Sequence, residues 1–84
     1  MKIIWSEESW NDFEWWLDQD KKMVKRIRKL IKDIKRHPFE GMGKPEPLKG
    51  ELSGLWSRRI SQEHRLDYYV EKNKLNIVAA RFHY

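Results

Sequence analysis

The apolar residues of this chain change their spacing halfway along it. From residue 10 to residue 34 they recur every three or four positions, which is the period of an amphipathic helix. From residue 55 onwards they form short runs and alternations, which are typical of strands. All three prolines and three of the four glycines lie in residues 38–50, which predicts a stiff loop between the halves. Helices first and strands second indicate the α+β class.

We expect the first half to contain a pair of helices. Ser6 can cap the first helix, and Asp20 can cap the second. The second helix should end at His37, because the residue before a proline disfavours helical dihedral angles. The predicted apolar faces consist of Trp10, Phe13, Trp16 and Leu17 in the first helix and of Met23, Val24, Ile27, Leu30, Ile31 and Ile34 in the second.

The second half predicts an antiparallel meander. Its strands are expected at residues 55–60, 65–70 and 75–84, and residues 2–5 should add an edge strand. The predicted fold is therefore two N-terminal helices packed on a small antiparallel sheet. At this length we expect a single domain over residues 1–84.

The chain is basic, with 18 Lys and Arg against 13 Asp and Glu and a formal net charge of +5. Residues 21–36 hold nine of the Lys and Arg and a single acid, Asp33. Two interpretations are open. This helix could lie on nucleic acid, whose phosphates attract such a face. It could also be the solvated face of an amphipathic helix, partly neutralised by the acidic residues 6–20.

Several classes of protein are excluded by composition. The chain has no cysteine, so it lacks disulfides, thiolate zinc sites and a cysteine nucleophile. Its three histidines are scattered, and we expect neither a metal site nor a cofactor. No apolar run approaches the roughly 18 residues of a membrane span, and the sequence turns acidic at Glu7, too early for a signal peptide. We therefore expect a cytoplasmic protein that binds no membrane.

Basic side chains interrupt the predicted strands. Arg59 and Arg65 fall in the first two strands of the meander, and Arg81 and His83 fall in the last. If helices cover one face of the sheet, a concave open face with these side chains is suited to bind phosphate. The alternative is an ordinary solvated face, on which arginines are common.

RNA cleavage without a metal needs three chemical roles, and the sequence offers candidates for each of them. A base must take the 2′-hydroxyl proton, an acid must protonate the departing 5′-oxygen, and a cation must stabilise the charged transition state. His83 can serve as the acid. Arg65 can serve as the cation, because its guanidinium binds phosphate oxygens in pairs.

The base is either Glu46 or Glu63. Glu46 is the first choice, because the prolines on both sides of it hold its carboxylate at little entropic cost. Glu63 lies in the predicted turn just before Arg65 and should contact substrate. Lys44 and Lys49 flank Glu46 and could hold the RNA backbone. The alternative for these loop residues is that they are merely solvated.

Four segments resemble the YoeB (Txe) toxins of the RelE/ParE superfamily. They are residues 43–49 (GKPEPLK), 56–60 (WSRRI), 63–66 (EHRL) and the pair His83–Tyr84. The resemblance implies a RelE-like fold similar to microbial ribonucleases. It also implies an mRNA interferase that enters the ribosomal A site and cuts the mRNA there, a YefM-type antitoxin as partner, and a homodimer.

The resemblance also implies site residues. Glu46 would be the general base, His83 the general acid and Arg65 the stabiliser of the transition state. Lys49 and Arg59 would contact phosphate, and Tyr84 would help to position the substrate. The products would carry a 2′,3′-cyclic phosphate and a 5′-hydroxyl.

One residue departs from the pattern of the family. Asp67 stands where its members usually carry an uncharged residue. It could pair with Arg65 and weaken that cation, or it could lie at the sheet edge and have little effect.

Two other functions explain less of the sequence. A ParE-like toxin with the same fold would inhibit DNA gyrase without catalysis, but such a binder has no use for Glu46, Arg65 and His83 together. A general RNA-binding module would leave the His83–Tyr84 pair unexplained, and the sequence carries no RNP-type or KH signature.

Overall fold

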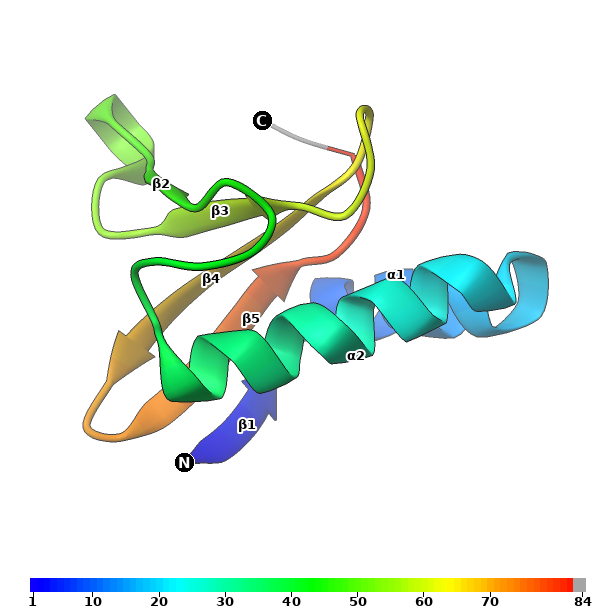
Figure 1. The fold of residues 1–84 in the computed structure, drawn as a ribbon, viewed down its shortest axis with the longest axis horizontal. Coiled ribbons are helices and arrows are strands. Elements are labelled where there is room, and N and C mark those ends of the chain that lie inside the picture. The colour runs from blue at the N-terminus through cyan, green and yellow to red at the C-terminus, as the bar shows by residue number, and fades with distance from the viewer. Residues whose placement is uncertain (83–84) are drawn as a thin grey trace.

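The computed structural model describes residues 1–82. Within this range the strands form one sheet in the order β1-β5-β4-β3-β2 (Figure 1). No helix of the described part is long and apolar enough to cross a bilayer. The elements are β1 (Lys2–Trp5), α1 (Glu7–Gln19), α2 (Lys21–Arg36), β2 (Glu46–Pro47), the 3₁₀ helix η1 (Gly50–Leu52), β3 (Trp56–Arg59), β4 (Arg65–Glu71) and β5 (Lys74–Ala79).

The α+β class, the helix pair and the edge position of β1 are confirmed. The sheet is mixed, because β1 pairs parallel with β5 while the remaining pairs are antiparallel. The helices connect β1 to the rest of the sheet, and such a long connection allows a parallel pair. A further strand, β2, forms inside the predicted loop and pairs with β3.

The predicted caps are correct. The Ser6 hydroxyl accepts a hydrogen bond from the Ser9 backbone N–H at 3.1 Å, and the Asp20 carboxylate accepts one from the Lys22 N–H at 3.0 Å. Both contacts satisfy N–H groups that have no partner within the helix. The buried side of α1 is narrower than predicted and leaves Trp10 and Leu17 exposed.

The core lies between α2 and the sheet, and α2 runs across one face of the sheet (Figure 1). Every residue of the predicted apolar face of α2 except the half-buried Met23 is buried. The core also contains residues of β4, β5 and α1, among them Leu66, Tyr68, Leu75, Ile77, Phe13 and Trp16. Polar side chains of β3 and β4 lie on the opposite face of the sheet.

A charged residue lies inside this core. Arg58 of β3 has an exposed fraction of 0%. Burial of an arginine is tolerable only when its N–H groups all find acceptors. These groups donate to the Asp33 carboxylate, the Tyr68 hydroxyl and the backbone carbonyls of His37, Glu40 and Met42.

The last strand is shorter than predicted and ends at Ala79. Side chains of α1 bind the backbone of the next residue: the Ala80 N–H donates to the Asp12 carboxylate at 3.0 Å, and the Ala80 carbonyl accepts from the Trp16 indole at 2.8 Å. The backbone of Ala80 therefore leaves the sheet for α1. His83 and Tyr84, which were predicted to lie in this strand, fall outside the described residues.

Candidate functional site

The face of the sheet away from α2 collects the predicted site residues. Glu46 pairs with Ser57, Ser57 pairs with Asp67, and Arg59 pairs with Arg65. Paired residues of antiparallel strands share a face, as do residues two apart in one strand. These five residues therefore lie on one face, which we call the open face.

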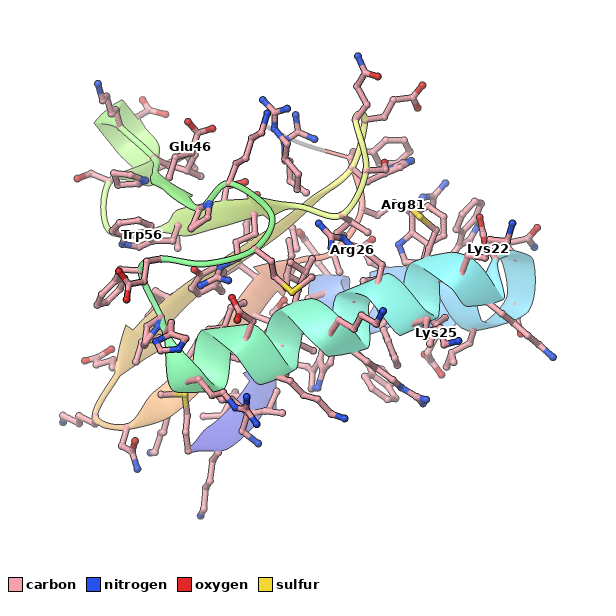
Figure 2. The ribbon with its side chains drawn as sticks, viewed as in Figure 1. Lys22, Lys25, Arg26, Glu46, Trp56 and Arg81 are labelled. Atoms are coloured by element: carbon pink, nitrogen blue, oxygen red, sulfur yellow. The ribbon has the colours of Figure 1, made fainter. Side chains whose placement is uncertain are left out.

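The orientation of the open face follows from Arg58. Neighbouring residues of a strand point to opposite sides of the sheet, and Arg58 points to Asp33 of α2. Ser57 and Arg59, on either side of Arg58, must then point away from the helices. Figure 2 shows Glu46 projecting from β2 away from α2, in agreement with this register.

Glu46 and Arg65 are separated by two strand spacings, roughly 10 Å, and by two residues along the strand, roughly 7 Å. Glu46 is exposed and Arg65 is half-buried. Both side chains are long, so a phosphodiester group placed between them is within reach of a carboxylate and a guanidinium. The structure thus brings together the preferred base and the predicted cation.

The guanidinium of Arg65 is held by hydrogen bonds from one of its three nitrogens. Its Nη1 donates to the carbonyls of Ser61, Gln62 and His64 at 2.8, 2.9 and 3.1 Å. Within residues 1–82, all hydrogen bonds of this side chain come from Nη1, so Nε and Nη2 keep N–H groups that can meet phosphate oxygens. The turn that precedes β4 therefore orients the cation.

Arg59 and Lys44 are brought together by the loop before β2. The Arg59 N–H donates to the Gly43 carbonyl at 2.7 Å, and both Arg59 and Lys44 are exposed. Gly43 has a φ of +81°, and a Cβ added there would lie 2.8 Å from Leu30 Cδ2. Glycine is thus required for this close approach. Lys49 is exposed on the other side of β2, where it precedes η1.

Glu63 lies outside the row of paired residues that runs across the sheet from Glu46 through Ser57 to Asp67. It is exposed in the turn between β3 and β4, and its Oε2 lies 3.9 Å from His64 Nε2. A carboxylate in this turn is beside Arg65 but outside the paired positions of the sheet. The register therefore favours Glu46 as the base and leaves Glu63 at the margin of the face.

Asp67 was given two possible positions, and the edge position is wrong. It lies in β4, between β3 and β5, with an exposed fraction of 1%. With Ser57, which is also buried, Asp67 forms the floor of the open face.

The prediction that Arg81 lies on the phosphate-binding face is wrong, because β5 ends at Ala79. The guanidinium carbon of Arg81 lies 3.6 Å from the ring centroid of Trp15 in α1 and 4.5 Å from that of Phe82. Arg81 therefore stacks on aromatic rings beside α1. His83 and Tyr84, the predicted acid and positioning residue, lie outside the described residues.

Two polar residues make contacts that the sequence did not predict. Arg58 was not predicted to be buried, although its signal was present: Asp33 is the one acid in a helix of nine cations. His64 was not assigned a role, yet its Nδ1 accepts a hydrogen bond from the Phe82 N–H at 2.8 Å. Nothing in the spacing of residues predicts that contact, because it joins a turn to the chain beyond β5.

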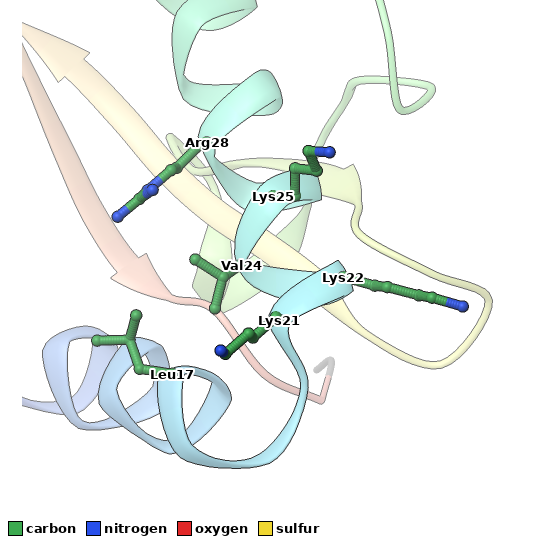
Figure 3. Close-up of a pocket in the computed structure, with 6 residues that line it drawn as sticks. All are labelled: Leu17, Lys21, Lys22, Val24, Lys25 and Arg28. Carbon is green, nitrogen blue, oxygen red and sulfur yellow. The ribbon is translucent and has the colours of Figure 1, made fainter.

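A second surface lies where α1 meets α2. It is a groove of about 480 Å³ whose apolar floor is Leu17 and Val24, and the side chains of Lys21 and Arg28 extend on either side of Val24 (Figure 3). We call it the basic groove. Its lining is completed by Lys22 and Lys25. Among residues 1–82, no group of three or more histidine, aspartate and glutamate residues is arranged to hold a metal ion.

Comparisons of the sequence with known proteins point to one family. Residues 5–84 match the family described as "YoeB-like toxin of bacterial type II toxin-antitoxin system". The chain is 62% identical to "Toxin YoeB" of Escherichia coli K12 over 84 residues, which is 100% of both chains.

Solved structures with the same fold agree. The "YoeB/ParE toxin from Agrobacterium tumefaciens" superposes with a TM-score of 0.98 at 50% identity over 100% of both chains. Two Staphylococcus aureus structures each cover 100% of this chain and 98% of theirs. One is a "YoeB dimer", with a TM-score of 0.94 at 45% identity, and the other is a "YoeB-YefM complex", with a TM-score of 0.93 at 44% identity.

Proposed function

This chain belongs to the YoeB-like toxins of bacterial type II toxin–antitoxin systems, and on that premise we propose that it is an endoribonuclease that cuts mRNA in the A site of the ribosome. Residues 1–84 act as one catalytic domain in the cytoplasm, where ribosomes are found. The observation that carries the proposal is the placement of Glu46 and Arg65 on the open face of the sheet.

Cleavage proceeds without a metal ion. Glu46 takes the proton of the 2′-hydroxyl, and the 2′-oxygen attacks the adjacent phosphorus. The bond from phosphorus to the 5′-oxygen breaks, and His83 protonates that oxygen as it leaves. Arg65 stabilises the charge that builds on the phosphate oxygens, through the N–H groups that its own turn does not use. The products carry a 2′,3′-cyclic phosphate and a 5′-hydroxyl.

The remaining site residues hold the RNA. Arg59 and Lys44 lie together on one side of Glu46, and Lys49 lies on the other, so the RNA backbone meets a cation on each side of the base. Glu63 contacts the substrate from the turn beside Arg65. The Tyr84 ring stacks on an mRNA base and positions it for cleavage.

The basic groove and the rest of α2 supply contacts to ribosomal RNA. Nine cations share this helix, and its one acid, Asp33, is paired with Arg58 and so offsets little of their charge. Cations on a helix surface attract a polyanion over distances of about a Debye length, roughly 8 Å at physiological salt. This favours the nucleic-acid interpretation of the helix over the purely solvated one.

The protein partners are proposed from the relatives. Since a 44% identical toxin forms a "YoeB-YefM complex" and a 45% identical one a "YoeB dimer", this chain pairs with a YefM-type antitoxin and forms a homodimer. An acidic antitoxin segment that covers the open face would remove Glu46 from the RNA and so inhibit cleavage.

The proposal is tested with purified protein in a reconstituted translation system. The mRNA should be cut when it is bound to ribosomes with an empty A site and should stay intact when ribosomes are omitted. Addition of a YefM-type antitoxin should abolish the cuts. A protein that leaves the mRNA intact and blocks supercoiling by DNA gyrase would instead be the non-enzymatic ParE-like toxin.

A further inference from the structure

The backbone of Phe82 adopts an unusual conformation. Its φ is +61°, in the left-handed region that a bulky L-residue rarely occupies. Its side chain is 58% exposed, so burial of the ring in the core does not hold it there. Strained residues of this kind persist only where surrounding contacts fix them.

Two backbone contacts fix Phe82, and they come from adjacent residues. The Phe82 carbonyl accepts a hydrogen bond from the Arg65 N–H at 2.8 Å. The Phe82 N–H donates to Nδ1 of His64, also at 2.8 Å. The residue that carries the proposed cation and the one before it therefore bind both polar groups of the chain directly before His83.

His64 is itself held in place. Its side chain is 15% exposed, its ring meets the Trp16 ring edge-on at 4.8 Å between centroids, and it lies 5.4 Å from the Phe82 ring. To accept a hydrogen bond, Nδ1 must be free of its proton, so the hydrogen of the neutral ring is on Nε2. The Glu63 carboxylate, 3.9 Å from Nε2, favours that tautomer.

We propose that His64 is a positioning residue: by accepting the Phe82 N–H at Nδ1, it sets the place from which the chain delivers His83 to the scissile phosphate. The inference rests on the proposed function of His83 as the general acid. Phe82 directly precedes His83 in the sequence, so the two hydrogen bonds that fix the Phe82 backbone fix the point from which the chain continues to the proposed acid. His64 itself takes no part in proton transfer.

The test compares two substitutions that differ in where they place an acceptor. In His64→Asn the amide oxygen stands near the place of Nδ1 and can still accept from Phe82. In His64→Leu the volume is kept and the acceptor is lost. Loss of position in a catalytic group by about 1 Å can cost on the order of 10²-fold in rate. We expect His64→Leu to lower kcat on programmed ribosomes by about that factor with KM unchanged, and His64→Asn to recover most of it.

A second readout follows the contact directly. Hydrogen exchange at the Phe82 amide should be fast in His64→Leu and slow in the wild type and in His64→Asn. Equal thermal unfolding temperatures show that the variants are folded. The matched control is His37→Leu, an exposed histidine at the end of α2, which should alter neither the rate nor the exchange.

The possible failures are distinguishable. If His64→Leu is folded and cuts at the wild-type rate, or if His64→Asn is as slow as His64→Leu, the inference about His64 is overturned. If the wild type leaves ribosome-bound mRNA intact, or if His83→Ala cuts as fast as the wild type, the proposed function is at fault. In that case the exchange rate of the Phe82 amide still decides whether His64 holds this backbone.

Discussion

The buried guanidinium of Arg58 and the partly exposed carboxylate of Asp33 meet at 2.5 Å and join β3 to α2. Arg58 lies between Ser57 and Arg59, which point to the open face. By holding Arg58 toward the helix, the pair sets which side chains of β3 point to the open face. A contact on one side of the sheet thus orients the residues on the other.

The first prediction concerns this pair. Asp33→Asn should lower the free energy of unfolding at pH 7 by roughly 1.5–3 kcal/mol, the usual worth of a hydrogen bond to a charged group. Arg58 would be left buried opposite a neutral amide. Urea unfolding measures the loss. Asp18→Asn, an exposed acid of α1, is the control and should change the unfolding free energy little.

The same pair predicts a dependence on pH. The hydrogen bond from Arg58, with a second one from the Met42 N–H, lowers the pKa of Asp33 below its ordinary value. A lowered pKa in the folded state stabilises the protein above the pKa of the unfolded state, and this stabilisation is lost as pH falls through the folded value. The difference between wild type and Asp33→Asn should therefore shrink below about pH 4. A difference that stays constant down to pH 2 would contradict this.

A further prediction separates the two candidate bases. Glu46→Gln keeps the shape of the side chain and removes the base, so cleavage should slow by about 10²–10⁴-fold. Glu63→Gln should slow it far less, since Glu63 lies outside the row of paired positions. Single-turnover cleavage on programmed ribosomes measures both. The reverse order of effects would assign the base to Glu63.

The basic groove makes a prediction about binding. Replacement of Lys25 and Arg28 by Glu should raise the ribosome concentration needed for half-maximal cleavage and leave the maximal rate unchanged. The effect should shrink as salt is added, because counterions screen such contacts. The matched control replaces Lys72 and Lys74 by Glu. These two lysines are also exposed, at the hairpin between β4 and β5. Equal effects of the two pairs would show only a response to net charge.

The helices were predictable because their apolar residues recur over many turns. Ser6 and Asp20 cap as expected, and the apolar residues of α2 line the core. The short β2 was not predictable, since Glu46 and Pro47 are typical of a loop and pair only because β3 lies beside them. The end of β5 was missed because Asp12 and Trp16 of α1 bind the backbone of Ala80. Contacts between distant parts of the chain leave no local pattern.

The candidate site, like the fold, could be predicted from the sequence only in part. Glu46 and Arg65 could be paired from the chemistry that each residue type supplies, and the register places them on one face. Arg81 could not be placed, because its stacking on Trp15 depends on where β5 ends. The edge position considered for Asp67 is wrong because the order of the strands, which no local pattern reveals, puts β4 between β3 and β5.

The central claim is cleavage by the 2′-hydroxyl with protein acid and base, and the ends of the cut mRNA test it most directly. Fragments from a reconstituted translation reaction, with the magnesium of the ribosome retained, should carry a 2′,3′-cyclic phosphate on the upstream piece and a 5′-hydroxyl on the downstream piece. Both are read by mass spectrometry. An upstream 3′-hydroxyl with a downstream 5′-phosphate would mean that an activated water attacked the phosphorus, and would contradict the account.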